Sequence, residues 1–274
     1  MLYFLTGVTA SGKSNLAHKI AIERNMPILS LDSMAVYKDL DILTAKPNEV
    51  MRTEVLYYGV DIAETDQNFS VVDYLNYLIE QKIPKLSFKT DILVVGGTGL
   101  YYKAIIDSFE FRPTDPAIRA ELELLNYEQL LQFHNLHKIK LPKSELNKRR
   151  LIRNIENSIL EESKYVFPPI NVNSDIVGIF WNNPNYKKNI ELRTKEMIEN
   201  GLIDEINKIK NPSKTILQAI GMKLDNNIEE NINIKTRKLA KKQITWFKKE
   251  KRLKMIETEN EKDVHDEMKG IIDG

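Results

Sequence analysis

The segment from Gly7 to Ser14 constrains the fold of this chain more than any other feature. Its residues match the pattern G-x-x-x-x-G-K-[ST] in full. They are Gly7, Val8, Thr9, Ala10, Ser11, Gly12, Lys13 and Ser14. An apolar strand pattern, Leu2 to Leu5, precedes the segment, and a helix pattern, Ser14 to Asn25, follows it. In that context backbone N–H groups converge on a polyphosphate, Lys13 adds a positive charge, and the Ser14 hydroxyl can reach Mg²⁺. This phosphate loop predicts diphosphate or triphosphate binding without fixing the reaction.

Three other apolar segments predict further strands. Ile28 to Leu31 and Ile92 to Val95 are apolar on both faces, and Ile176 to Phe180 resembles them. A helix pattern, Val71 to Leu86, separates the first two, and Pro84 predicts an end or kink near this proline. Buried strands that alternate with helices are typical of a parallel sheet in an α/β fold. Together with the phosphate loop they predict a P-loop NTPase-like core, a parallel sheet flanked by helices.

The character of the chain changes near Phe111-Arg112-Pro113. From there to about residue 174 it is charged, helical in pattern and poor in strand signals. The simplest organisation is therefore an α/β core, residues 1–111 and 175–274, interrupted by a helical insertion domain, residues 112–174. The part from Tyr186 onward is expected to be helical, with a loop and a helix start between 226 and 233.

Composition limits the possible function classes. The 274 residues carry 40 basic and 39 acidic side chains and no cysteine, so disulfide scaffolds, thiol nucleophiles and cysteine metal sites are excluded. The absence of cysteine is compatible with a cytoplasmic location. No apolar stretch approaches the roughly 18 residues of a membrane span, and no targeting segment is recognisable.

Two polar segments follow predicted strands. Asp32 comes directly after the second strand, where it could hold Mg²⁺, act as a general base, or cap a helix. Thr98, in the glycine-rich turn after Ile92 to Val95, could hydrogen-bond a ligand or cap the next helix. Ligands bind at this edge of such sheets.

Two basic stretches make nucleic acid a candidate partner. Lys138 to Arg153 holds seven cations against one acid, and Lys235 to Lys254 holds ten against one. Such runs are most often solvated faces, but beside a phosphate loop they also suit an RNA backbone. His134 and His137 form a weak zinc signal, because no third ligand lies nearby in the sequence.

The ordered set of motifs resembles the bacterial tRNA dimethylallyltransferase family over nearly the whole chain. Its segments are Gly7–Ser14, Asp32–Tyr37, Thr44–Pro47, Gly96–Tyr101, Arg149–Arg153, Met197–Glu205, Gln218–Gly221 and Thr236–Phe247. The chain departs from the family pattern at Ala35, where Gln is usual, at Asn189, where Arg is common, and at Met222-Lys223-Leu224. The insertion is also short for the family.

The resemblance implies transfer of a five-carbon prenyl group from dimethylallyl diphosphate to the exocyclic amine of the adenosine just 3′ of the anticodon. It implies catalytic roles for Lys13, Asp32 as base, Thr98 and Arg193, and Mg²⁺ at Ser14. It also implies an insertion domain that grips the anticodon stem-loop of tRNA. The residues implied in tRNA binding are Asp32, Ser33, Met34, Ala35, Thr98, Arg119, Arg149, Arg150, Leu151, Ile152 and Arg153.

Several alternatives stay open at this point. Enzymes that prenylate free adenine nucleotides, small-molecule kinases and non-catalytic RNA-binding NTPases share the same loop. The basic stretches and the insertion favour tRNA, since a free nucleotide needs neither. Whether ATP also binds is not decided by the sequence. The single-chain motif set suggests a monomer without a membrane partner.

Overall fold

The computed structural model describes residues 1–274 apart from 108–109, 112–114, 143–145, 161–164, 174 and 225. The chain forms two compact units. The first unit is Met1–Asp107 with Pro168–Gly274, and the second is Ser108–Phe167. The predicted domain boundaries fall on residues 112 and 174, which lie outside the described residues.

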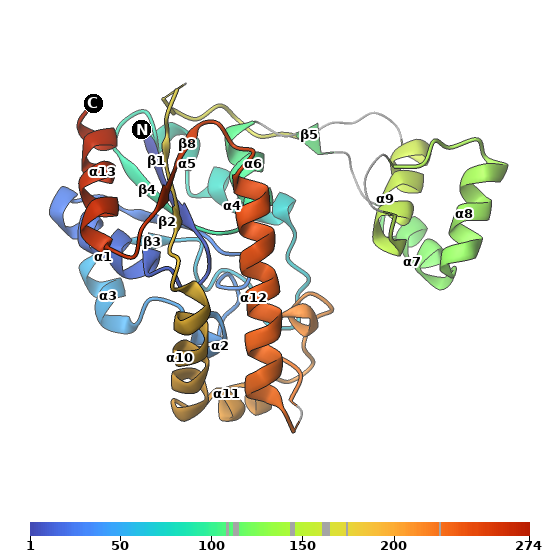
Figure 1. The fold of residues 1–274 in the computed structure, drawn as a ribbon. Coiled ribbons are helices and arrows are strands. Elements are labelled where there is room, and N and C mark those ends of the chain that lie inside the picture. Colours follow the sequence, from blue (N-terminus) through green and yellow to red (C-terminus); the bar gives the residue numbers. More distant parts are fainter. Residues whose placement is uncertain (108–109, 112–114, 143–145, 161–164, 174, 225) are drawn as a thin grey trace. The chain divides into compact units, whose positions relative to one another are not determined.

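A six-stranded parallel sheet forms the centre of the first unit (Figure 1). Its strands in spatial order are β3 (Tyr57–Tyr58), β2 (Ile28–Leu31), β4 (Ile92–Gly96), β1 (Leu2–Gly7), β7 (Gly178–Asn182) and β8 (Leu253–Glu257). Every residue of β1, β4 and β7 is buried, which explains their apolar pattern on both faces. The parallel register places Leu2 beside Ile92 and Phe4 beside Gly178. The predicted parallel α/β fold is confirmed.

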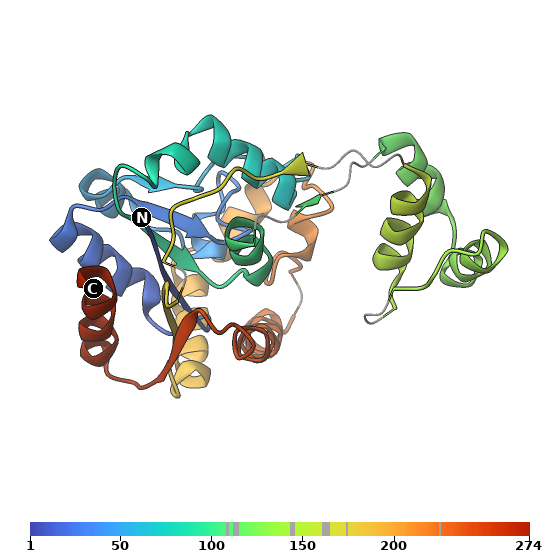
Figure 2. The same ribbon diagram turned by 90° about the horizontal axis from the view of Figure 1, so that it is seen from above.

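Alternation along β1 divides the core into two layers. Tyr3 and Leu5 belong to a cluster with apolar residues of α1 (Lys13–Arg24) and α13 (Glu261–Asp273). Phe4 faces the other way and meets Tyr102 of α6 (Gly99–Ile106), with ring centroids 5.1 Å apart. On that face Phe180 stacks on Phe247 of α12 (Ile228–Phe247). Helices therefore cover both faces of the sheet (Figure 2).

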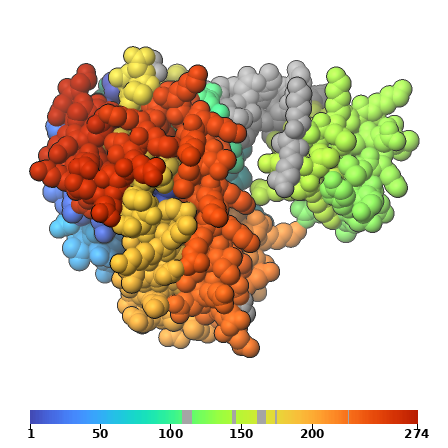
Figure 3. Space-filling view, in the orientation of Figure 1, coloured from blue at the N-terminus to red at the C-terminus, as the bar shows by residue number. Residues whose placement is uncertain are grey.

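Shorter and peripheral helices complete the first unit. They are α2 (Asp41–Thr44), α3 (Glu49–Glu54), α4 (Val71–Glu80), α5 (Ile83–Leu86), α10 (Tyr186–Glu199), α11 (Leu202–Lys208) and the 3₁₀ turn Ile216–Gln218. In Figure 3, α12 runs along the surface beside α10.

One prediction about secondary structure is confirmed and another needs correction. The segment Val71 to Leu86 forms two helices, and the break is at Lys82, which has φ 58° and lies two residues before Pro84, so the end expected near this proline is confirmed. Pro84 lies in the first turn of α5, where its missing N–H is tolerated. The part after Tyr186 is not all helical, because β8 pairs with β7 at the sheet edge. Three of its five residues are exposed and it lies among lysines, so it lacks the apolar run of a central strand.

The second unit contains three helices among its described residues and a small antiparallel ladder. The helices are α7 (Pro116–Leu124), α8 (Tyr127–Leu136) and α9 (Lys148–Ile159), and the ladder joins β5 (Glu110–Phe111) to β6 (Tyr165–Val166). Its buried cluster consists of Leu122, Leu130, Leu151, Ile152 and Ile155. Asn126 caps α8 through a reciprocal capping box with Gln129.

Candidate active site

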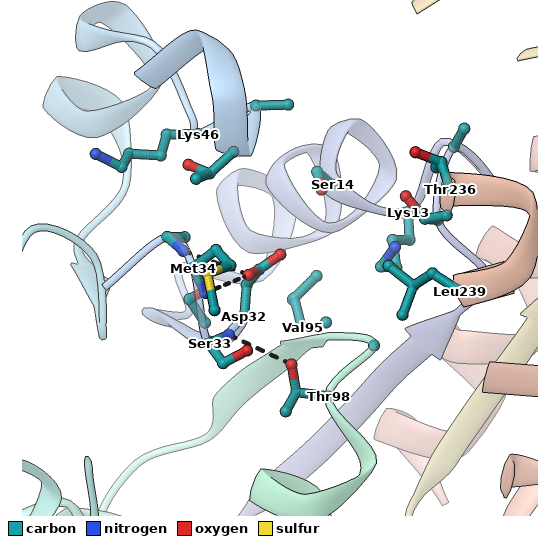
Figure 4. Close-up of a pocket in the computed structure, with 18 of the residues that line it drawn as sticks. Lys13, Ser14, Asp32, Ser33, Met34, Lys46, Val95, Thr98, Thr236 and Leu239 are labelled. Carbon is teal, nitrogen blue, oxygen red and sulfur yellow. Dashed lines mark hydrogen bonds between the residues drawn. The ribbon is translucent and has the colours of Figure 1, made fainter. Parts of the chain in front are cut away.

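A cavity of about 790 Å³ opens in the first unit at the carboxyl ends of the strands (Figure 4). The phosphate loop, the turn after β2, the loop after β4, and helices α10 and α12 supply most of its lining. Because β4 lies between β1 and β2, the loop after β4 lies between the phosphate loop and the Asp32 turn. The sheet order thus brings three predicted segments to one site.

The phosphate loop has the backbone that its sequence predicts. Ala10 and Gly12 adopt the left-handed region, with φ 60° and 99°, and α1 begins at Lys13. A Cβ on Gly7 would lie 2.7 Å from the Trp181 carbonyl oxygen, so glycine is required for that close approach. The backbone N–H groups of the first turn of α1, together with the helix dipole, make this end of the cavity a site for an anion.

Two cations lie at this site. The Lys13 ammonium donates to the Val8 carbonyl at 3.2 Å, and the Arg193 guanidinium of α10 donates to the Thr9 hydroxyl at 3.3 Å. Burial and the neighbouring Arg193 lower the pKa of Lys13 to about 8, while Asp32 partly opposes the shift. Burial also lowers the pKa of Arg193. Both shifts describe positive charge held out of water, which an anion would stabilise.

Asp32 is fixed by the turn that follows it. Its Oδ1 accepts hydrogen bonds from the backbone N–H groups of Met34, at 2.8 Å, and Ala35, at 3.3 Å. Residues 33–36 form a turn, so Asp32 orders a turn and caps no helix. Its carboxylate lies in the cavity lining (Figure 4).

Thr98 is joined to the same turn. Its hydroxyl accepts a hydrogen bond from the Ser33 N–H at 3.3 Å, and its own N–H donates to the Leu31 carbonyl at 3.2 Å. Thr98 is the N-cap residue of α6, but its side chain makes no capping hydrogen bond. The hydroxyl therefore faces the Asp32 turn, and the alternative of a side-chain cap is excluded.

Side chains that the sequence left without an individual role brace the phosphate loop. The amides of Asn183 and Asn189 donate to the carbonyls of Ser11 and Ala10, at 3.2 and 3.0 Å. Gln243 of α12 accepts from the Thr9 N–H at 2.9 Å. The sequence signals were membership of Gln243 in the segment Thr236–Phe247 and the departure from the family pattern at Asn189. Neither predicts these contacts, which join residues more than 170 positions apart.

The segment Thr44–Pro47 forms part of the cavity wall. The Lys46 side chain is fully buried and pairs with Asp61 at 2.6 Å and Asp41 at 3.2 Å. The Glu205 carboxylate accepts from the N–H groups of Ile42 and Leu43, both at 2.8 Å, at the start of α2. These charges hold the wall in place.

Comparison with known proteins agrees with this geometry. Residues 35–250 match the family model described as IPP transferase. The chain belongs to the IPP transferase family. It is 32% identical to the tRNA dimethylallyltransferase of Halothermothrix orenii, over 98% of this chain and 92% of the relative. It is also 32% identical to that of Campylobacter jejuni strain RM1221, over 89% and 90%.

A solved structure supports the same assignment. The full-length tRNA isopentenylpyrophosphate transferase from Bacillus halodurans aligns with a TM-score of 0.68 and 25% identity, covering 99% of this chain and 96% of that one. The fold expected from the resemblance to this family is therefore confirmed. Among the described residues, no helix is long and apolar enough to cross a membrane.

The residues of the second unit that the family resemblance implies in tRNA binding divide into three groups. Leu151 and Ile152 are 0% and 5% exposed and pack in the unit's core, so we revise the expectation for their side chains. Arg149 and Arg150 are exposed on α9. Arg119 and Arg153 both donate to the carboxylate of Glu156, which is fully buried.

The basic stretch Lys235 to Lys254 also contains both ion-paired and exposed side chains. Arg237 pairs with Glu191, and Arg252, beyond the helix, pairs with Glu250 at 3.0 Å and with Asp107 at 2.5 Å. The side chains of Lys238, Lys241 and others remain exposed. Part of this charge therefore stabilises the fold.

The weak zinc signal finds no support. His134 is buried, and its ring nitrogens lie 2.8 Å from the Leu130 carbonyl and 3.0 Å from the Asn154 side-chain oxygen. His137 stacks on Phe133. Within the part of the chain that the structure describes, no cluster of three or more His, Cys, Asp or Glu side chains could hold a metal ion.

Replacing Arg119 by alanine is expected to destabilise the second unit. Glu156 would lose its two-pronged partner while staying buried and would keep only Arg153, so the change costs up to about 3 kcal/mol of unfolding free energy. Hydrogen exchange of the amides in α7 to α9 measures this effect, with Glu121→Ala on the exposed side of α7 as control. Loss of RNA binding with unchanged exchange would instead assign Arg119 to the RNA interface.

Proposed function

We propose that this chain transfers a dimethylallyl group from dimethylallyl diphosphate to the N6 amine of the adenosine immediately 3′ of the anticodon in tRNA, and releases diphosphate. The observation that carries the proposal is the pair of desolvated cations, Lys13 and Arg193, in the same cavity as the carboxylate of Asp32. A diphosphate-binding end and a basic oxygen in one cavity suit transfer of a group away from a diphosphate. The named relatives carry out this class of reaction.

In the proposed reaction, the allylic carbon of the donor exchanges its bond to oxygen for a bond to nitrogen. The amine nitrogen attacks the allylic carbon, the bond from that carbon to the diphosphate oxygen breaks, and the nitrogen loses a proton. Lys13, Arg193 and the loop N–H groups stabilise the charge that builds on the departing diphosphate. Asp32 takes the proton. An adenine amine is a poor nucleophile because its lone pair is delocalised into the ring, so orientation and a nearby base matter.

Mg²⁺ fits the oxygen donors at the phosphate end. Ser14 is exposed and lines the cavity, and it follows Lys13 in the first turn of α1. Mg²⁺ usually binds to one or two protein oxygens together with substrate phosphates, so a cluster of three carboxylates is not required. When bound, the ion would neutralise charge on the leaving diphosphate.

The proposed acceptor is a flipped base of the anticodon loop. An enzyme that modifies a base usually takes it out of the stack and into a pocket. Arg149 and Arg150 on the second unit are the proposed contacts to the backbone of the stem-loop. Ser33, Met34, Ala35 and Thr98 are proposed to contact the target nucleotide. We further propose that the chain acts as a monomer in the cytoplasm.

A labelled-donor assay tests the reaction. The protein is incubated with radiolabelled dimethylallyl diphosphate, Mg²⁺ and unmodified tRNA with adenosines 3′ of the anticodon, and separately with AMP or with ATP alone. We expect label in the tRNA and none in AMP, with no ATP turnover. Label in AMP would favour a free-nucleotide enzyme, and ATP turnover without transfer would favour a kinase or an NTPase.

Replacing both Arg149 and Arg150 by alanine is expected to weaken tRNA binding and to flatten its dependence on salt. Each phosphate contact releases counterions, so losing both lowers the slope of log K against log salt by about 1 to 2. Fluorescence anisotropy at several salt concentrations measures the slope. The Lys85→Ala, Lys89→Ala variant, with two exposed lysines of the first unit changed, is the control. An unchanged slope would remove Arg149 and Arg150 from the interface.

Diphosphate affinity is expected to fall above about pH 8. The free protein holds Lys13 with a pKa of about 8, below its ordinary value, and a bound anion favours the charged form and raises this pKa. As the pH rises above 8, binding must therefore take up a proton at Lys13, which costs up to about tenfold in affinity per pH unit. Calorimetry with a non-reactive alkyl diphosphate measures both affinity and proton uptake. Constant affinity into the alkaline range would contradict the role of Lys13.

A further inference from the structure

We infer that Gln243 is a positioning residue that locks the diphosphate-binding loop to the loop that carries Thr98. Its Oε1 accepts a hydrogen bond from the Thr9 N–H at 2.9 Å, and its Nε2 donates to the Gly97 carbonyl at 3.2 Å. The side chain is 9% exposed and lines the cavity. The inference deepens the proposed function, because it concerns the same site.

A primary amide is the group that this place requires. The backbone N–H of Thr9 can only donate, and the carbonyl of Gly97 can only accept, so the two partners fix which end of the Gln243 amide faces which loop. An ionised glutamate could accept from Thr9 but could not donate to Gly97. A methionine would fill the space and form neither hydrogen bond.

The loop that carries Gly97 and Thr98 lies in close contact with α12. A Cβ on Gly97 would lie 2.2 Å from the Gln243 Nε2, and a Cβ on Gly99 would lie 2.5 Å from the Trp246 ring. Gln243 and Trp246 are three residues apart and so lie on the same side of the helix. Two of the glycines in the segment Gly96–Tyr101 thus admit side chains of α12.

The Gln243 amide completes a hydrogen-bonded path between the reacting groups. Thr9 belongs to the loop that ends in Lys13, and Gly97 is adjacent to Thr98. The Thr98 hydroxyl accepts from the Ser33 N–H, next to Asp32. The diphosphate end and the base are therefore held at a fixed separation through Gln243. Fixed separation matters for group transfer, because a displacement of about 1 Å can cost 10²-fold in rate.

The test compares Gln243→Met with Gln243→Glu. The methionine variant is expected to lower kcat about 10- to 100-fold, with the KM for donor and tRNA changed by less than about threefold, because alignment rather than binding is lost. Hydrogen exchange at the Thr9 amide is expected to become faster in the methionine variant and to stay slow in the glutamate variant, which keeps the acceptor. Gln81→Met, at an exposed position at the end of α4, is the control and is expected to match wild type in all readouts.

Unchanged kcat in Gln243→Met, or a fall in kcat that only follows loss of thermal stability, would overturn the inference. If the methionine variant does not fold, Gln243→Glu decides: full kcat in that variant would show that the Gly97 bond is not needed. The proposed function and the positioning role of Gln243 can be refuted independently. Absence of transfer by the wild-type protein counts against the proposed function, whereas the exchange rate of the Thr9 amide reports on the bridge without any turnover.

Discussion

Replacing Asp32 by asparagine is expected to lower the rate of prenyl transfer by about 10²- to 10⁴-fold, the usual contribution of a general base. Asparagine keeps the shape of the side chain, and its oxygen can still accept from the Met34 and Ala35 N–H groups that fix the turn. It cannot take the proton that the attacking amine must lose. Single-turnover transfer to labelled tRNA measures the rate, and anisotropy measures tRNA affinity, which we expect to stay within about twofold.

Asp39→Asn is the matched control for this change. Asp39 is exposed, does not line the cavity, and has φ 57°, a left-handed conformation that asparagine adopts readily. The control is expected to transfer at the wild-type rate. If Asp32→Asn lost tRNA affinity as strongly as it lost activity, Asp32 would be a binding residue and another group would be the base.

Replacing Lys13 by methionine is expected to lower kcat/KM by at least about 10²- to 10³-fold, as for removal of a preorganised group that stabilises developing negative charge. Methionine retains the length of the side chain without its charge. The same change is expected to raise the melting temperature of the ligand-free protein. The lowered pKa shows that the folded state disfavours charged Lys13, through burial and through Arg193, so removing the charge relieves both costs.

Opposite changes in activity and stability distinguish this prediction from simple unfolding. Differential scanning calorimetry gives the melting temperature, and initial rates at varied donor concentration give kcat/KM. Lys19→Met, on the exposed side of α1, removes only a surface ion pair with Glu261 and is expected to change both quantities little. A lower melting temperature in Lys13→Met would contradict the argument that this lysine is held at a cost in stability.

The local motifs of the site could be predicted from sequence because each depends on neighbouring residues. The phosphate loop needs glycine at the left-handed Gly12, a requirement of the local backbone that appears in the sequence as a fixed spacing. Asp32 and Thr98 follow apolar strands directly, and the end of a parallel strand is where ligands bind. Neither inference needs knowledge of distant contacts.

The residues of the second unit that are proposed to contact tRNA show where this reasoning ends. A run of cations predicts an exposed basic face, but Arg153 of that run and Arg119 of α7 converge on Glu156, which lies 3 and 37 positions away from them. Leu151 and Ile152 follow Arg150 in the same motif, yet they face the core. A linear motif does not separate the two faces of a helix until the helix has a partner to pack against.

Sequence by itself determined the parallel α/β class, the phosphate loop and the residues that carry charge and basicity, because these follow from strand hydrophobicity and short-range spacing. Tertiary structure alone decided that β4 lies between β1 and β2, that β8 joins the sheet edge, and that Gln243 ties Thr9 to Gly97. These features depend on contacts between residues more than 60 positions apart, whose pairing is selected by packing of the whole sheet and its helices rather than by any local pattern.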